Sequence, residues 1–267
     1  MDIFKRELAP VTDTAWDEIR EEAQRRLRAN LTARRVMDLN GPHGPDFAAL
    51  SLGRLQQPAE QPVAGVGYGV HRVLPLVELR APFELDKWEL DNAERGAQDL
   101  DLDPVADAAR AVAHFEERAI YEGLETAGIP GLRAVAEHKP IKLGADPVEY
   151  AKPIAQAVDV LRGADVTGEM ALVLGPKTYN ALAAAHKQGY QPWNHVEKLI
   201  GGPILSSPVL AGGFLLSQRG GDFEIILGQD AALGWERSQE AGKVRLFLME
   251  SFSFRVIDPE AFVVLDA

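Results

Sequence analysis

The chain has 267 residues, 46% of them hydrophobic and 25% charged, so it is long enough to bury a large core in one or two domains. Its net charge of −12 argues against binding nucleic acid through phosphates and against binding anionic membranes. The absence of cysteine excludes disulfides, thiol catalysis and cysteine-based metal sites. The charged first ten residues lack the apolar core of a signal peptide, so we expect a cytoplasmic protein.

Residues 12–35 carry the first strong helical pattern. Apolar residues recur at three- and four-residue steps on one face, and the remaining surface is rich in Arg and Glu. The apolar stripe consists of Trp16, Ile19, Ala23, Leu27 and Leu31. We expect a helix over 12–35, capped by Asp13 or Thr14 and followed by a turn at residues 41–44.

The segment over residues 51–69 is a poor core sequence, because Pro and Gly interrupt it repeatedly. We expect a long extended loop of the kind that carries function or assembly contacts. Residues 70–85 then predict a strand, and residues 84–96 predict a short helix. Asp86 and Glu89 have the spacing of a capping box at the start of that helix.

The longest helix is predicted over residues 103–123. Pro104 suits the first helical position, Asp103 is placed to cap it, and Gly123 supplies a stop. The residues expected to share its apolar face are Val105, Ala108, Val112, Phe115 and Ala119.

Residues 132–218 alternate helical and strand patterns, which predicts a separate α/β lobe. Its expected elements are helices over 146–161, 176–187 and 193–200 and a strand over 170–174. We expect the first of these helices to be kinked or interrupted at Pro153. The charge-free run over 199–218 has the length of a membrane span, but repeated Gly and Pro favour turns and short strands.

The C-terminal part reads as β structure. Residues 214–218 and 223–227 predict a hairpin closed on Gly220 and Gly221, and residues 244–262 predict a long strand.

An acidic run before the long helix resembles the start of a calcium-binding loop, but the full residue pattern of such a loop is not present. Asp99, Asp101 and Asp103 have the right spacing, but Pro104 stands where Gly is needed and Arg110 where Glu is needed. We interpret the run as negative charge that stabilises the start of the helix.

Other catalytic patterns are also missing from the sequence. It has no His-Glu-x-x-His motif, no Gly-x-Ser-x-Gly elbow, and no pair of Glu-x-x-His motifs for a di-iron site around His114. His186 and His195 flank the loop over 188–192, where a solvated loop is favoured over a metal or catalytic site. A dispersed triad stays open, although nothing in the sequence calls for one.

Several stretches, in order along nearly the whole chain, resemble the bacterial encapsulin shell proteins, once labelled linocin-type bacteriocins. They are residues 4–19 (FKRELAPVTDTAWDEI), 33–44 (ARRVMDLNGPHG), 74–86 (LPLVELRAPFELD), 88–96 (WELDNAERG), 219–230 (RGGDFEIILGQD), 233–235 (LGW) and 245–261 (RLFLMESFSFRVIDPEA). Each motif is weak alone, and their joint order and spacing are specific.

This resemblance implies the α+β major-capsid fold of tailed phages (Hong Kong 97 type). Residues 1–46, 76–131 and 219–267 would form a discontinuous peripheral domain, and residues 132–218 an axial domain that meets its copies around a five-fold axis. Residues 47–75 would form an extended loop arm that laps onto a neighbouring subunit.

The implied function is that of a shell component without enzyme activity. About 60 copies or more would close into an icosahedral nanocompartment around a cargo enzyme. The cargo would be a dye-decolorising peroxidase or a ferritin-like protein, serving oxidative-stress defence or iron storage. Two alternatives remain: a phage or prophage major capsid protein, and an enzyme such as a flavin-binding oxidoreductase or a peptidase.

By the same resemblance, a short cargo tail would dock inside the shell on the N-terminal helix and nearby C-terminal strands. The matching positions are Leu27, Leu31, Arg34 and Asp38, with Leu233, Trp235 and Leu246 as further contributors. Apolar side chains would bury the tail, and Arg34 and Asp38 would fix its direction. The competing interpretation is ordinary core packing with a surface ion pair.

Two further sites are implied. Some encapsulins bind a flavin, such as FMN or riboflavin, on a tryptophan and an arginine that match Trp88 and Arg80, although a tryptophan early in a helix is more often part of a core or an interface. No cofactor is required for a shell, and no metal site is expected. The loop that would line the five-fold pore contains Lys187, Gln188, Gly189 and Tyr190.

Overall fold

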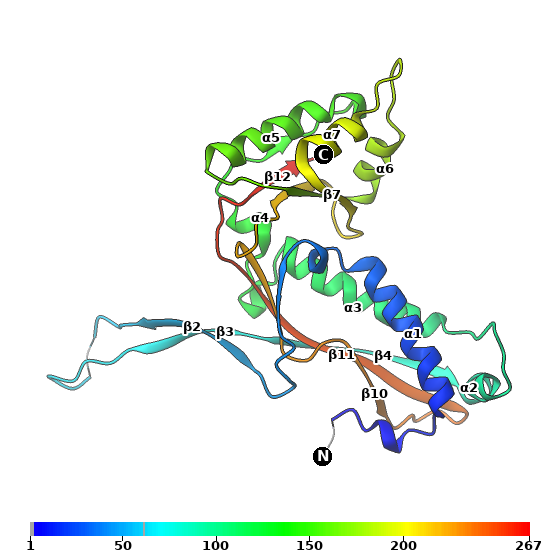
Figure 1. Cartoon of the computed structure of the whole chain (residues 1–267). Helices are drawn as coiled ribbons and strands as arrows, with labels where there is room; N and C mark the ends of the chain where they lie inside the picture. Colours follow the sequence, from blue (N-terminus) through cyan, green and yellow to red (C-terminus); the bar gives the residue numbers. More distant parts are fainter. Residues whose placement is uncertain (1–2, 61) are drawn as a thin grey trace.

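The computed structural model describes residues 3–60 and 62–267 and contains two five-stranded sheets joined by a shared core (Figure 1). Residues 1–2 of the predicted peripheral domain and residue 61 of the predicted arm lie outside the described residues. Helices and strands both contribute to the core, so the predicted α+β class is confirmed. Within the described ranges, no helix combines the length and apolar character needed to cross a membrane.

The first sheet is organised around its longest strand, β11 (Lys243–Val256). One edge of β11 pairs with β4 (Val77–Asp86). Along the other edge, the first half of β11 pairs with β10 (Ala232–Glu236) and its C-terminal end pairs with β9 (Phe223–Leu227). The short strand β1 (Asp38–Asn40) adds to β9 in parallel. The predicted strand over 244–262 is therefore confirmed up to Val256.

Helix α1 (Asp13–Asn30) packs against the long helix α3 (Asp103–Tyr121) over this sheet (Figure 1). All five residues of the predicted apolar stripe of α1 are buried, because they form one core with α3, β4 and β11. The cap is Thr12, whose hydroxyl accepts from the Ala15 N–H at 3.3 Å, and not Asp13 or Thr14. The helix also ends earlier than predicted, and a separate 3-10 turn, η2 (Ala33–Arg35), follows it.

Helix α3 begins at the predicted residue and ends two residues short of Gly123. The carboxylate of Asp101, and not that of Asp103, accepts from the first backbone N–H, at 3.2 Å. Gly123 has a φ of +99°, and a Cβ there would lie 2.5 Å from the Pro130 carbonyl oxygen, so this turn requires glycine. Phe115 is 40% exposed, because it lies at the edge of the apolar face and not within it.

The short helix α2 (Lys87–Glu94) has half of the predicted capping box. The Asp86 carboxylate accepts from the Trp88 N–H at 2.8 Å, as expected. Glu89 instead accepts from the Asp101 N–H at 2.9 Å, so it holds the loop that leads into α3.

The second sheet has the strand order β5-β12-β8-β6-β7. Its strands are β5 (Ile141–Lys142), β6 (Met170–Leu174), β7 (Gly201–Ser206), β8 (Gly213–Ser217) and β12 (Phe262–Asp266). Its short elements and helices are η3 (Glu125–Ala127), α4 (Gly131–Val135), η4 (Pro147–Glu149), α5 (Ala151–Gly163), α6 (Pro176–Ala184) and α7 (Pro192–Ile200). Pro153 lies in the first turn of α5, where its missing N–H costs nothing, so the helix starts there and is not kinked by it.

The predicted hairpin over residues 214–218 and 223–227 is wrong. Strand β8 lies between β12 and β6 in the second sheet, whereas β9 lies between β1 and β11 in the first. Both edges of β8 are therefore occupied, and the Gly220–Gly221 turn carries the chain from one sheet to the other. Both glycines have left-handed φ values, +79° and +82°, which suits a sharp change of direction.

The chain crosses back once more after β11, and this corrects the predicted boundary of the peripheral domain. Strand β12 lies within the predicted peripheral range 219–267, yet it pairs with β5 and β8 in the second sheet. One buried cluster spans both sheets and includes Tyr121, Phe214 and Phe252. The two halves are thus packed against each other through a common core.

The extended arm projects away from both sheets (Figure 1). Strands β2 (Ala49–Gln56) and β3 (Val70–Pro75) pair with each other in an antiparallel ribbon and form a separate two-stranded sheet. Large apolar side chains on this arm face solvent in the single chain: Leu55, Val63, Val66, Tyr68, Val70 and Val73. An isolated ribbon gains little stability from such side chains, so they point to contacts with another molecule.

Candidate functional site

A pocket of about 510 Å³ opens at the C-terminal end of α1, and we call it the α1 pocket. Its lining residues are Gln24, Leu27, Arg28, Leu31, Arg34, Arg35, Asp230 and Ala231. The structure therefore brings together three of the predicted cargo-binding residues, Leu27, Leu31 and Arg34. The two leucines supply an apolar floor, and each is less than 10% exposed.

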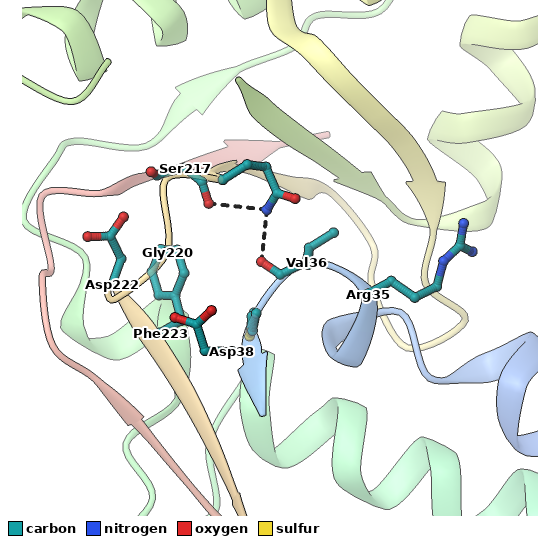
Figure 2. A pocket seen from close by; sticks show the side chains of 9 residues that line it. Arg35, Val36, Asp38, Ser217, Gly220, Asp222 and Phe223 are labelled. Atoms are coloured by element: carbon teal, nitrogen blue, oxygen red, sulfur yellow. Dashed lines mark hydrogen bonds between the residues drawn. The ribbon is translucent and has the colours of Figure 1, made fainter. Parts of the chain in front are cut away.

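Asp38 lies apart from these residues, in a smaller pocket of about 220 Å³ between the two sheets (Figure 2). Its carboxylate accepts from the Gly221 N–H at 2.6 Å, which ties β1 to the turn that crosses between the sheets. The Gln218 amide donates to the Val36 carbonyl at 2.8 Å in the same region (Figure 2). In the single chain Asp38 thus has a structural contact and does not line the α1 pocket.

The C-terminal candidates belong to the core around the same sheet. Leu233 is 6% exposed and Leu246 is fully buried, so neither presents a surface in the single chain. Trp235 is half-buried and lies opposite Leu246 in the β10–β11 register, and its backbone N–H donates to the Phe4 carbonyl at 2.8 Å.

Arg34 forms one wall of the α1 pocket and is held by three carboxylates. Its guanidinium donates to Glu116 at 2.6 Å and to Asp230 at 2.7 Å, and it also pairs with Glu250. Glu116 and Glu250 are fully buried, and one Glu250 oxygen has no hydrogen-bond partner. Burial and the neighbouring Glu116 raise the pKa of Glu250 well above its usual range. We infer that Glu250 holds a proton at neutral pH. The Arg34 guanidinium then faces two carboxylates, those of Glu116 and Asp230, and one neutral carboxyl group.

Glu117, the next residue on α3, fastens the end of α1 to the second sheet. Its carboxylate accepts from the Thr32 hydroxyl, from the Ala33 N–H at 2.7 Å and from the Ser207 hydroxyl at 2.7 Å. Burial raises its pKa to about 7, against these three donors, which favour the ionised form. The sequence offered a signal for both acids: Glu116 and Glu117 occupy inward-facing steps between Ala113 and Ile120.

We expect Glu117→Gln to reduce the pH dependence of stability. The folded-state pKa of about 7 lies above the usual 4.5, so the folded chain holds this proton more tightly than the unfolded chain. The stabilisation is fully present below about pH 4.5 and is lost as the pH rises through about 7, with a size on the order of 3 kcal/mol. Denaturation midpoints at about pH 5 and about pH 8 measure the effect.

Wild-type protein should lose stability between these two pH values, and Glu117→Gln should lose less. Glu250 acts in the same direction, so part of the dependence should remain in the variant. The exposed Glu125→Gln is the matched control and should behave as wild type. A Glu117→Gln profile as steep as that of wild type would contradict the assignment.

Trp88 and Arg80 do not form one site within the chain. The indole is 72% exposed and is approached by the Arg95 guanidinium, 5.8 Å from the ring centre. The Arg80 guanidinium pairs with Glu78 at 3.1 Å and lies 4.9 Å from the centre of the Phe247 ring. Arg80 lies six residue steps before Asp86 in one continuous strand, which corresponds to roughly 20 Å.

The predicted pore residues form a tight exposed turn between α6 and α7. Lys187 and Tyr190 exchange two backbone hydrogen bonds of 2.9 Å, and Gln188 and Gly189 both have left-handed φ values, +49° and +84°. The flanking His195 lines a pocket beside this turn, whereas the His186 ring contacts the Ala184 carbonyl. Across the described ranges, no cluster of His, Asp or Glu could hold a metal ion.

The comparisons with known proteins agree with this architecture. The Linocin_M18 family model, described as "Encapsulating protein for peroxidase", matches residues 1–253. A crystal structure titled as a virus-like particle from Pyrococcus furiosus superposes with a TM-score of 0.69 over 94% of this chain and 98% of that one, at 17% identity. A chain from the capsid of an empty GTA particle gives a TM-score of 0.59 over 89% and 90% of the two chains, at 15% identity. These likenesses show that the chain has a phage-capsid-like fold.

Sequence relatives are much closer. A type 1 encapsulin shell protein of Mycolicibacterium paratuberculosis is 42% identical over 99% of both chains. Another from Rhodospirillum rubrum is 42% identical over 99% of this chain and 96% of the relative. The family match over residues 1–253, together with this level of identity, shows that the chain belongs to the type 1 encapsulin shell proteins, which are structural shell components and not enzymes.

Proposed function

We propose that about 60 copies or more of this chain close into an icosahedral compartment that holds a cargo enzyme. The observation that carries this proposal is the unsupported arm of a capsid-like fold, whose exposed apolar side chains require a neighbouring copy to cover them. A cytoplasmic compartment fits the family to which the chain belongs. The alternatives of a phage capsid protein and of an oxidoreductase or peptidase are less well supported, since the full-length relatives with about 40% identity are encapsulin shell proteins.

Expression of the chain alone, followed by size exclusion and negative-stain microscopy, tests this proposal. We expect uniform hollow particles without any cargo gene. A monomer or a small oligomer would contradict it.

We further propose that the cargo is a peroxidase, because the matching family model is described as encapsulating one. The associated role is defence against oxidative stress. A ferritin-like cargo with a role in iron storage is the second candidate. Mass spectrometry of particles purified from the native host identifies the cargo directly.

We place the binding site for the cargo tail in the α1 pocket. Leu27 and Leu31 supply an apolar floor, and a tail side chain that covers it gains about 25 cal/mol for each Å² of apolar surface removed from water. The other predicted residues would contribute only indirectly, through the shape of the surrounding sheet. Asp38 lies in another pocket, and the core or its edge contains Leu233, Trp235 and Leu246.

Leu31→Asp is expected to abolish cargo capture while particles still form. A carboxylate at the floor of the pocket removes the apolar surface that the tail would cover and would lose its hydration beneath any docked apolar group, at a cost of several kcal/mol. Co-purification of cargo with the variant shell is the measurement.

Because Leu31 is itself 6% exposed, a second variant separates blocked docking from damaged folding. Gln24→Trp fills the pocket from its exposed rim and leaves the core unchanged. Undiminished cargo in both variants would rule out this placement.

The turn formed by Lys187, Gln188, Gly189 and Tyr190 is our candidate for the lining of the five-fold pore. Its exposure at the tip of the second lobe supports this role. A particle reconstruction that places residues 187–190 away from every opening would contradict it.

Flavin binding is a separate proposal, with Trp88 as the stacking surface in the assembled shell. The exposed indole supports it, whereas the separation from Arg80 weighs against a site within one chain. Purified shell that bound FMN or riboflavin would show flavin absorption, and Trp88→Ala would remove it. Wild-type particles without these bands would end the proposal.

A further inference from the structure

The arginines along α1 and η2 fall into two classes. Four of them have carboxylate partners: Arg20 with Asp17, Arg25 and Arg26 with Glu22, and Arg34 with the three acids described above. Arg28 and Arg35 have no ion pair or hydrogen bond to a side chain of the described residues, and both are exposed. Both of these arginines line the α1 pocket, together with the paired Arg34.

The pocket is therefore positive in a chain whose net charge is −12. Asp230 is the one acid among its lining residues, and that carboxylate is already paired with Arg34 at 2.7 Å. The acids of the neighbouring pocket do not neutralise Arg35 either, because its guanidinium points away from Asp38 and Asp222 (Figure 2). Two free guanidinium groups thus stand beside an apolar floor.

We propose that the occupant of the α1 pocket is a peptide segment with an acidic side chain next to its apolar anchor. Leu27 and Leu31 would cover the apolar side chain, and Arg28 and Arg35 would pair with the Asp or Glu. This inference rests on the proposed docking of a cargo tail in the pocket and adds the chemistry that selects the tail.

The apolar floor favours a peptide over a nucleic acid. A polyanion gains little from leucine side chains, and the −12 charge of the whole chain repels it at longer range. A single carboxylate, in contrast, matches the fork of donors on a guanidinium and forms a charge-assisted hydrogen bond. The ion pairs of Arg34 hold part of the pocket wall in place, so the pocket is preorganised to bind the tail.

A tail library tests the proposal within the assembled protein. A fluorescent reporter with short randomised C-terminal tails is co-expressed with the chain, particles are purified by size, and the retained tails are sequenced. We expect wild-type particles to enrich tails that combine Leu, Ile or Val with Asp or Glu. Double replacement Arg28→Gln and Arg35→Gln should reduce the enrichment of acidic residues about tenfold and keep that of apolar residues.

The matched control is the double variant Arg20→Gln and Arg25→Gln. It removes the same amount of positive charge, here from α1 at positions outside the pocket, and should retain wild-type selection. Equal enrichment of acidic and neutral tails by wild type would overturn the proposal, as would acidic enrichment that survives the Arg28 and Arg35 replacements. Selection for the terminal carboxylate, lost when one neutral residue is appended to every tail, would overturn the side-chain assignment.

Two further outcomes separate this inference from the proposed function. If Leu31→Asp and Gln24→Trp abolish retention of all tails and wild type shows no acidic preference, the α1 pocket is supported as the docking site. The inference that the tail carries an acidic side chain then fails. If these two variants retain every tail, the docking site itself is misplaced. Nucleic acid in wild-type particles that disappears with Arg28 and Arg35 would identify a polyanion as the occupant and would overturn the peptide proposal.

Discussion

Arg34→Met is expected to reduce the free energy of unfolding by about 3–5 kcal/mol, because it leaves the buried carboxylate of Glu116 without a cation, beside the protonated Glu250. Methionine retains the volume and the apolar stem of the side chain, so the loss of charge dominates the effect. The measurement is guanidinium denaturation of purified protein, followed by tryptophan fluorescence.

Glu250→Gln is the informative control. If Glu250 already carries a proton, the side-chain amide of the introduced glutamine can donate to Glu116 in place of that proton. The substitution should then lower the free energy of unfolding by less than about 1 kcal/mol. Equal destabilisation by Arg34→Met and Glu250→Gln would show that Glu250 is ionised in the folded chain. That result would contradict our charge assignment for the cluster.

Replacing Leu55, Val70 and Val73 with Ser is expected to abolish particles and to leave folded subunits. Each of these arm side chains is more than half exposed in the single chain, and none belongs to a buried core cluster. A neighbouring copy that buries them gains about 1.5–3 kcal/mol for each, and this gain recurs at every copy of the contact in a closed shell. Size exclusion and negative-stain microscopy report the loss of particles, and circular dichroism reports the fold.

Polar positions on the same ribbon provide the matched comparison. Gln56→Ser and His71→Ser change exposed side chains on β2 and β3 without removing apolar surface, and particles should persist. Normal particles from the Leu55, Val70 and Val73 variant would mean that the arm does not carry assembly. Loss of secondary structure in that variant would show that the arm supports the fold of its own chain.

Local patterns in the sequence predicted local structure well. The stripe from Trp16 to Leu31 is buried, and α3 begins at its predicted residue, because side chains three and four residues apart on a helix share a face wherever the helix is packed. Strand partners did not follow from such patterns. The run from 214 to 227 has the composition of a hairpin, yet each half had a better partner elsewhere in the chain, in β12 and β6 or in β1 and β11.

The candidate site was predictable to a similar degree. Leu27, Leu31 and Arg34 were predicted from the resemblance to encapsulin shell proteins, and because they are close in sequence they share the α1 pocket. The acids that hold Arg34 come from α3, from the segment after β9 and from β11, and only the folded chain brings them together. The unpaired state of Arg28 and Arg35 is equally a property of the three-dimensional arrangement, since other arginines of α1 do find partners.

Strands β11 and β12 occupy interior positions in the two sheets. Strand β11 has β4 on one side and β10 and β9 on the other, and β12 lies between β5 and β8. Neither sheet can close until these strands have left the ribosome. A nascent chain that lacks β11 and β12 therefore cannot complete either sheet. Completion of both sheets therefore depends on two strands that lie late in the sequence, and a subunit competent for assembly forms only once both strands are available.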